Sequence, residues 1–198
     1  RKRRSAAVRA PRMRPKRPPR AVFLVGFMGA GKSRVGRALA RLLGWRFVDL
    51  DRRVEAREGR SIAQIFRGSR EAAFRQAETA ELKGLLGELM GSPGTVVALG
   101  GGVPAQAANR KLLRGAQTVF VDVPAGALWE RCRAGRGKRP LVRDEASFRR
   151  LYDARRPHYA AATVRVRAGE RSPTELAAEI ARRLGFSIGR GNRTQEKP

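Results

Sequence analysis

A glycine-rich stretch, GFMGAGKSR, runs from Gly26 to Arg34 and has the residue types of a phosphate-binding loop. In such a loop, glycines let backbone N–H groups close around phosphate oxygens. A lysine then reaches the β- and γ-phosphates, and a serine hydroxyl ligates Mg²⁺. An apolar run precedes the stretch and a helix-like pattern follows it, which is the context that the motif requires. We therefore predict a nucleoside triphosphate site with Mg²⁺, whose pattern G-x-x-x-x-G-K-S is formed by Gly26, Gly31, Lys32 and Ser33.

Two carboxylates follow in the segment VDLD, at Asp49 and Asp51. We expect this segment to end a β-strand, and the alternation of a strand would place both side chains on one side of the chain. Open α/β sheets bind their ligands at the carboxyl edge. Two carboxylates at that edge suit a metal ligand and a base or anchor for a hydroxyl group.

Alternating strand-like and helix-like segments would position these groups. Short apolar runs predict strands at residues 21–26, 45–50, 95–100, 118–123 and 163–168. Helical periodicity predicts helices at residues 33–44, 61–66, 70–89, 104–115, 124–135, 146–162 and 172–185. The sixth helix should be interrupted near Pro157, and the last should have Ser172 as N-cap and Pro173 at its first position. Five short strands separated by helices predict an α/β fold with a parallel sheet covered on both faces.

The composition says more about the cellular compartment of the protein than about its function. The chain has 198 residues and a formal net charge of +27, which suits anionic ligands and nonspecific contact with nucleic acid. Cys132 is the single cysteine, so an intramolecular disulfide and a multi-cysteine zinc site are excluded. No apolar run approaches 18 residues, and no secretory signal is recognisable. We expect a cytoplasmic protein.

The two ends of the chain differ in composition from the middle. Residues 1–20 carry ten Lys or Arg, several prolines and no acidic residue. We expect this segment to be a disordered basic tail that binds nucleic acid only nonspecifically, and residues 187–198 to be a second loose tail. One domain is therefore expected at residues 21–186, a length sufficient for a substantial core.

Seven motifs in order resemble those of the shikimate kinases. They are GFMGAGKS, VDLD, SIAQIF, the FRxxE pattern of residues 74–78, ALGGG at 98–102, RPLV at 139–142 and the RxPxY pattern of residues 155–159. The order and spacing match from about Ala21 to Gly185. The resemblance implies a P-loop kinase fold similar to nucleoside monophosphate kinases. It also implies ATP-dependent phosphorylation of the 3-hydroxyl of shikimate, on the way to chorismate and aromatic amino acids, by a monomer.

The resemblance also implies roles for residues of the acceptor site. Asp51 would bond the hydroxyls of shikimate and orient or deprotonate the nucleophile. Arg75 and Arg155 would clamp the substrate carboxylate, for which the planar guanidinium fork is suited. Gly101 would let the substrate approach backbone N–H groups. Asp49, together with Ser33, would hold Mg²⁺.

For the nucleotide, the resemblance implies a site formed by the loop, a lid and one distal arginine. The lid is expected at about residues 133–144, where Arg139 would stabilise charge on the transferring phosphoryl group. Lys32 and Arg139 join Asp51 as the expected catalytic residues. The expected nucleotide-binding residues are Gly29, Ala30, Gly31, Lys32, Ser33, Arg34, Arg139 and Arg171.

This chain departs from the usual family pattern at two positions. Arg34 occupies the position after the loop serine, where the family usually has threonine, and Arg70 precedes Glu71 where a glycine is usual. Neither change removes an expected catalytic group, so they bear on nucleotide affinity more than on reaction type. His158 and Cys132 are expected to be surface or packing residues.

Two other functions remain compatible with the sequence. One is a related small-molecule kinase such as a gluconate kinase, whose acceptor site would not call for the FRxxE, GGG and RxPxY set. The other is a shikimate-kinase-like ligand sensor in a DNA-binding regulator. A helix-turn-helix domain needs about 60 residues or more, which a 20-residue tail cannot supply. The objection to the sensor hypothesis would weaken if the reading frame continued upstream of Arg1.

Overall fold

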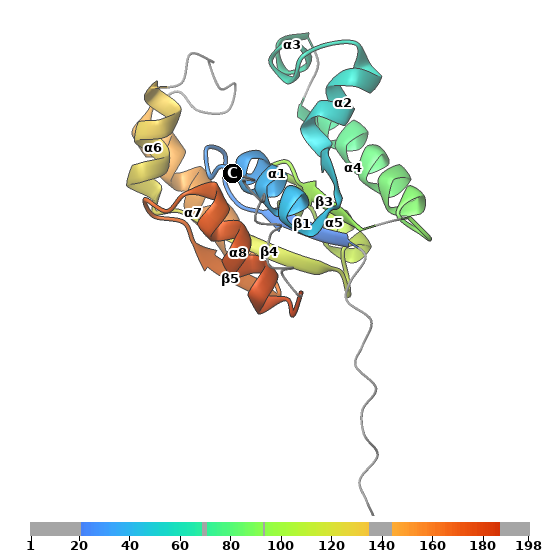
Figure 1. Cartoon of the computed structure of the whole chain (residues 1–198). Coiled ribbons are helices and arrows are strands. Elements are labelled where there is room, and N and C mark those ends of the chain that lie inside the picture. The colour runs from blue at the N-terminus through green and yellow to red at the C-terminus, as the bar shows by residue number, and fades with distance from the viewer. Residues whose placement is uncertain (1–20, 69–70, 93, 135–143, 187–198) are drawn as a thin grey trace, which may run out of the picture.

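The computed structural model describes residues 21–68, 71–92, 94–134 and 144–186. Its described part is built on a five-stranded parallel sheet with the order β2-β3-β1-β4-β5 (Figure 1). The strands are β1 (Ala21–Val25), β2 (Arg46–Asp49), β3 (Thr95–Ala98), β4 (Gln117–Asp122) and β5 (Val164–Arg167). The central strand β1 is buried from Val22 to Val25, as its apolar sequence predicts for a sheet covered on both faces.

Helices connect these strands. They are α1 (Lys32–Leu43), α2 (Leu50–Glu58), α3 (Ile62–Gly68), α4 (Glu71–Glu88), α5 (Ala107–Leu112), α6 (Ala125–Ala134), α7 (Glu145–Ala160) and α8 (Pro173–Arg183), with a 3₁₀ turn η1 (Val103–Ala105). α8 has the expected N-cap at Ser172, whose side chain accepts from the backbone N–H of Glu175 in a capping box.

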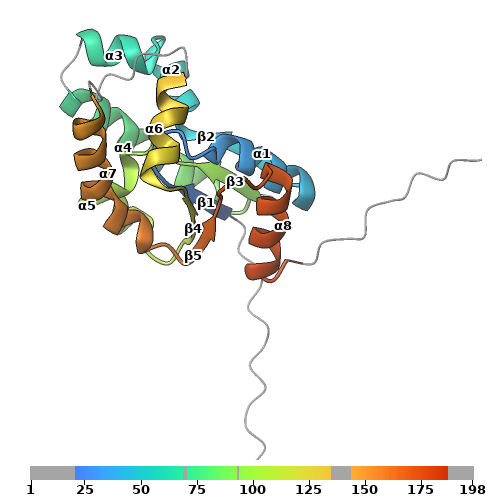
Figure 2. The same cartoon turned by 90° about the vertical axis from the view of Figure 1, so that its left-hand side faces the viewer.

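The helices form a layer on each face of the sheet (Figure 2). α1 and α8 pack against each other on one face, whereas α4, α5 and α7 lie on the other. The predicted α/β architecture is therefore confirmed. Because all strands are parallel, their carboxyl ends and the loops that follow them meet at one edge of the sheet.

The expectation for Asp51 was wrong in its local structure. β2 ends at Asp49, and Asp51 lies in the first turn of α2, a helix that the sequence pattern did not predict. Asp49 has extended backbone angles and its side chain accepts from the backbone N–H of Arg52, so it is the N-cap of α2. Strand alternation therefore does not relate the two carboxylates.

Two predicted helices also differ from the structure. α7 continues through Pro157 to Ala160 because Tyr159, fully buried, anchors its last turn in the core. The helix expected at residues 104–115 is divided into η1 and α5, since Gln106 adopts extended backbone angles between them.

Several expectations fall on residues outside the described ones. These are the two tails, the segment of the expected lid at 135–143 with Arg139, and Arg70. Among the described residues, no helix is both long and apolar enough to cross a membrane.

Candidate active site

The loop between β1 and α1 has the backbone of a phosphate-binding loop. Gly29 and Gly31 adopt left-handed angles, with φ of 79° and 84°, and Gly31 is the N-cap of α1 without a side-chain capping bond. The first N–H groups of α1 are therefore not occupied by a capping side chain and face the loop. Ala30, between the two glycines, is buried. This arrangement is suited to bind an anion at the start of α1.

The side chain of Lys32 is held across this loop by hydrogen bonds to backbone carbonyl groups of the loop. Its ammonium group donates to the carbonyl oxygens of Gly26 at 2.9 Å and Phe27 at 3.1 Å. The charge therefore lies over the loop rather than in solvent, where it can meet phosphate oxygens.

Ser33 and Asp49 bring two oxygen ligands together beside Lys32. The Ser33 hydroxyl donates to Oδ2 of Asp49 at 2.5 Å. Hydroxyl and carboxylate oxygens fit Mg²⁺, which is usually held by one or two protein groups and by substrate phosphates and water. The described residues contain no group of three or more His, Cys, Asp or Glu that could hold a metal alone. The pair thus fits a metal that binds together with a nucleotide.

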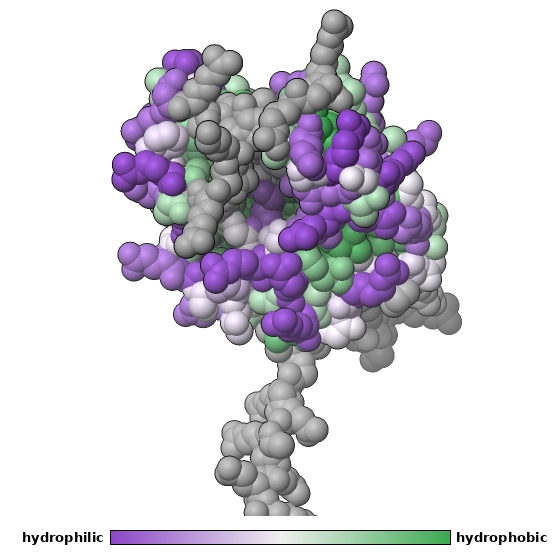
Figure 3. Space-filling view, turned by 90° about the horizontal axis from the view of Figure 1, so that it is seen from above, coloured by the Kyte–Doolittle hydropathy of each residue, from purple (hydrophilic) through white to green (hydrophobic). Residues whose placement is uncertain are grey.

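A separate cavity of about 110 Å³ lies beside the loop at the carboxyl edge of the sheet, and we call it the acceptor cavity. All four residues expected to bind the acceptor line it, and each comes from a different element: Asp51 from α2, Arg75 from α4, Gly101 from the loop after β3 and Arg155 from α7. Met28, Ile62, Phe66, Phe74, Glu78 and Gly102 complete the lining. Figure 3, a view from above, shows this side of the molecule hollowed and bordered by hydrophilic side chains.

Arg155 is a buried cation at this cavity. The residue is 8% exposed, and burial lowers the pKa of its guanidinium group, with nearby Arg75 acting in the same direction. A hydrogen bond with Tyr159 opposes this effect. Among the described residues no carboxylate lies within ion-pair distance of Arg155. Two neighbouring guanidinium groups, one of them without a carboxylate partner, favour an anionic ligand between them.

Arg75 is instead fixed by acidic neighbours. Its guanidinium group donates to Glu78 at 2.9 Å and to Glu71 at 3.1 Å. Glu78 is 1% exposed, and burial raises its pKa although Arg75 acts in the opposite direction. Gln106 donates to the same oxygen of Glu78 at 3.0 Å.

Glu78 and Gln106 are site residues that the sequence pattern did not assign. Glu78 was visible as the last position of the FRxxE pattern, but the pattern alone does not show that it positions the arginine. Nothing in the sequence around Gln106 indicated that it reaches α4.

Asp51 is placed between charged groups of both signs. Burial raises its pKa most, Lys32 opposes this, and the nearby carboxylate of Asp49 raises it further. A carboxylate whose proton affinity is increased in this way is suited to accept a proton from a hydroxyl group.

Glycines allow these charged side chains to approach the loop after β3. A Cβ atom at Gly100 would lie 2.4 Å from a carboxylate oxygen of Glu78 and 2.5 Å from one of Asp51. At Gly102 it would lie 2.0 Å from Arg75. At Gly101 the nearest atom, the backbone nitrogen of Met28, is 3.4 Å away, and the Tyr159 hydroxyl donates to the Gly101 carbonyl at 2.5 Å. The tightest approaches are therefore at the two outer glycines.

Two expected nucleotide residues lie away from the acceptor cavity. Arg34, in the first turn of α1, is exposed, and its side chain forms no hydrogen bond or ion pair with the described residues. Arg171, between β5 and α8, pairs with Glu179. The structure therefore brings together the acceptor residues and the loop residues, while among the described residues it shows no contact between Arg171 and either group.

Comparisons with known proteins agree with this geometry. The family model described as shikimate kinase matches residues 28–185. A shikimate kinase of Persephonella marina is 38% identical over 167 residues, which are 83% of this chain and 99% of the relative. A shikimate kinase of Thermus thermophilus is 40% identical over 178 residues, covering 85% and 91% of the two chains.

Solved structures show the same likeness. The shikimate kinase of Acinetobacter baumannii, in complex with shikimate, superposes with a TM-score of 0.76 at 34% identity, covering 83% of this chain and 92% of the other. The Aquifex aeolicus enzyme gives 0.72 at 36% identity, covering 83% and 96%. A deoxyadenosine kinase from M. mycoides, at 12% identity and a TM-score of 0.55, shares the fold. The family match spans most of the chain and two relatives exceed one third identity, so this chain belongs to the shikimate kinase family.

Proposed function

We propose that this protein transfers the γ-phosphoryl group of ATP to the 3-hydroxyl of shikimate, giving 3-phosphoshikimate and ADP. The observation that carries the proposal is the acceptor cavity, in which the carboxylate of Asp51 and two guanidinium groups meet next to a phosphate-binding loop. Shikimate is a polyol carboxylate and needs both kinds of group. Family membership and the likeness to a relative solved with shikimate support the same acceptor.

The two arginines orient the acceptor by its carboxylate. Arg155 supplies a cation that has no carboxylate partner among the described residues, and Arg75 supplies one that Glu78 holds in place at 2.9 Å. A carboxylate bound to both replaces the water that burial has removed from them. The acceptor is then fixed with its hydroxyls toward Asp51, which converts an encounter in solution into a reaction between positioned groups.

Asp51 acts on the nucleophile. Its carboxylate accepts the proton of the 3-hydroxyl, the oxygen bonds to the γ-phosphorus, and ADP leaves. Burial and the carboxylate of Asp49 raise the pKa of Asp51 while Lys32 opposes them, and a carboxylate with a raised pKa is a stronger base toward the hydroxyl proton.

The nucleotide is bound by the loop and Lys32. Backbone N–H groups from Gly29 to Ser33 would surround the β-phosphate, and Lys32 would move from the loop carbonyls to the β- and γ-phosphates. Ser33 and Asp49 would hold Mg²⁺, which supplies charge neutralisation of the phosphates when bound. By resemblance, Arg139 stabilises the transferring group and Arg171 stacks on adenine.

A coupled assay of ADP release tests the proposal with shikimate, quinate and gluconate as acceptors. Shikimate should be phosphorylated only with Mg²⁺ and ATP, with a KM between about 1 μM and 1 mM. Asp51→Asn should abolish turnover while leaving ADP binding intact, since the carboxamide cannot take the proton. Phosphorylation of gluconate without phosphorylation of shikimate would show that the acceptor is misassigned.

A further inference from the structure

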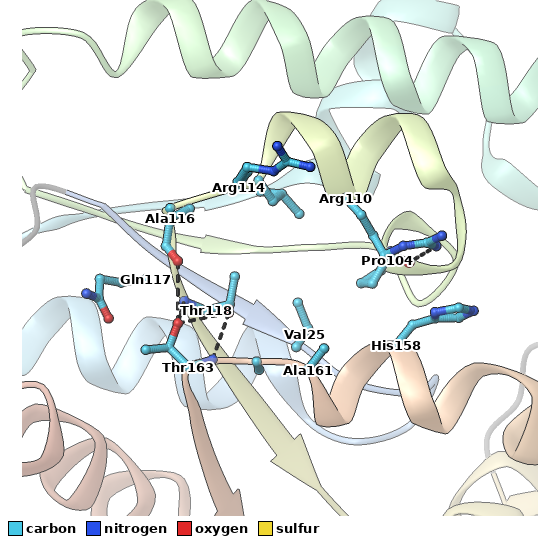
Figure 4. A pocket seen from close by; sticks show the side chains of 13 residues that line it. Val25, Pro104, Arg110, Arg114, Ala116, Gln117, Thr118, His158, Ala161 and Thr163 are labelled. Atoms are coloured by element: carbon cyan, nitrogen blue, oxygen red, sulfur yellow. Dashed lines mark hydrogen bonds between the residues drawn. The ribbon is translucent and has the colours of Figure 1, made fainter.

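A second cavity, of about 440 Å³, lies on the sheet face that α5 and α7 cover (Figure 4). Residues at the C-terminal ends of α5 and α7 line it, together with residues of the strands β1 and β4. Its lining residues are Val25, Pro104, Arg110, Leu113, Arg114, Gly115, Ala116, Gln117, Thr118, His158, Ala161, Ala162 and Thr163. None of these residues belongs to the acceptor cavity or to the phosphate-binding loop.

The floor of this cavity is partly apolar. Val25, Leu113 and Ala161 contribute aliphatic side chains, while Thr118, Thr163 and Gln117 are its polar residues. The two threonines that lie there bond each other: the N–H of Thr163 donates to Thr118 Oγ1 at 3.1 Å, and the N–H of Thr118 donates to Thr163 Oγ1 at 3.4 Å. Since their polar atoms already have partners, the floor favours an apolar body.

The rim of this cavity carries basic residues. Arg110, Arg114 and His158 line the cavity, whereas none of its described lining residues is acidic. Figure 4 shows Arg110 and His158 at the same end, next to Pro104. Nη1 of Arg110 donates to the carbonyls of Pro104 at 2.9 Å and Ala105 at 2.8 Å, so this guanidinium group is held in place before a ligand arrives. A positioned cation beside a partly apolar floor selects a ligand with an anionic group on a compact ring.

We propose that this second cavity binds a small organic acid, a carboxylate attached to an apolar ring, with the carboxylate at Arg110 and His158. The two cavities also share structural elements. Arg110 holds the two carbonyls of η1, and η1 directly follows Gly101 and Gly102 of the acceptor cavity. On the other side, α7 presents His158 to the second cavity and Arg155 to the acceptor cavity. An occupant therefore changes the affinity for the acceptor through η1 and α7.

Benzoate is a suitable probe, with benzamide as its neutral isostere. The full chain, of 21.8 kDa, is titrated with each probe and followed by its backbone amide resonances. Saturating shikimate is present so that the probe does not enter the acceptor cavity. Benzoate should shift the resonances of Ala116, Thr118 and Thr163 with a Kd in the millimolar range, and benzamide should bind about tenfold more weakly. Equal binding of the two probes, or no shift at these residues, would overturn the site.

Variants of the basic lining residues locate the carboxylate. The side chains of His158 and Arg114 make no hydrogen bond or ion pair with described side chains, so His158→Ala and Arg114→Gln should fold normally; each should weaken benzoate about fivefold. Lys111→Gln is the matched control, because it removes one charge from α5 outside the lining and should leave the Kd unchanged. Equal weakening by all three variants would mean that benzoate senses only net charge, which contradicts the proposal.

The coupling has its own readout. With shikimate still saturating, benzoate binding at the second cavity should move the amide resonances of Gly101 and Gly102. If the resonances of the second cavity move while those of the two glycines stay constant, the coupling is refuted.

Discussion

Replacing Arg155 by methionine should separate acceptor binding from nucleotide binding. Methionine keeps most of the buried volume and removes the charge. Arg155 is 8% exposed and has no carboxylate partner among the described residues, so its charge is kept for a ligand. Truncating one partner of such a desolvated pair costs about 2–5 kcal/mol. The expected loss in kcat/KM for shikimate is therefore roughly 30-fold to several thousandfold.

The same variant should show the opposite effect on the empty protein. Burial lowers the pKa of Arg155, which means that the folded state disfavours this charge when no anion is bound. Without shikimate, Arg155→Met should unfold at an equal or higher denaturant concentration than the wild type. With shikimate, the wild type should gain stability and the variant should gain almost none.

The assay combines steady-state kinetics with thermal scans in the presence of shikimate or ADP. Arg156→Met is the matched control, since this neighbouring arginine does not line the acceptor cavity. It should retain both the kinetic constants and the response to shikimate. The reasoning is refuted if Arg155→Met weakens ADP as much as shikimate, or if Arg156→Met reproduces its effect.

Three further changes test other parts of the description. Arg34→Thr should raise the melting temperature without nucleotide, because a cation in the first turn of α1 costs about 0.3–1 kcal/mol. It should also reduce the extra stabilisation that ADP-Mg²⁺ gives. If ADP raises the melting temperature of both proteins equally, Arg34 makes no contact with the nucleotide. Glu78→Gln should remove a pH dependence of the free energy of unfolding. Burial raises the pKa of Glu78, so the folded wild type binds more protons than the unfolded chain. The wild type should therefore lose stability relative to the variant as the pH rises above about 4.5. Denaturation curves between pH 4.5 and 7 decide this, and a constant difference would contradict it. Deleting residues 1–20 should leave kcat unchanged and weaken retention on DNA at low salt, and a large loss of activity would show that the segment docks on the domain.

The sequence predicted the sheet well because its inner strands β1, β3 and β4 are short apolar runs that are largely buried. By resemblance, the FRxxE, GGG and RxPxY motifs also indicated residues that the structure places around one cavity; their roles in binding the acceptor stay a prediction. What the sequence missed was decided by tertiary contacts. Asp49 caps α2 with its side chain, so the chain turns into a helix one residue earlier than strand alternation implies.

Two other misses have the same origin. Pro157 is tolerated inside α7 because the burial of Tyr159 outweighs the loss of one helical hydrogen bond. Gln106 separates η1 from α5 while its side chain reaches Glu78 on another helix. Neither contact can be predicted from the local periodicity of the sequence.

The outer glycines of the loop after β3 limit how this protein can change its acceptor during evolution. Alanine at Gly100 would require Asp51 and Glu78 to retreat, and alanine at Gly102 would require Arg75 to do so. The atoms in the way are the far ends of these side chains, so alanine at either glycine would displace a charged group of the acceptor cavity rather than the backbone. Under the proposed function, such a displacement weakens the binding of shikimate before it favours another acceptor. New acceptor specificity is more accessible through residues on the apolar side of the cavity, such as Ile62 and Phe66, whose side chains pack against a small hydrophobic cluster.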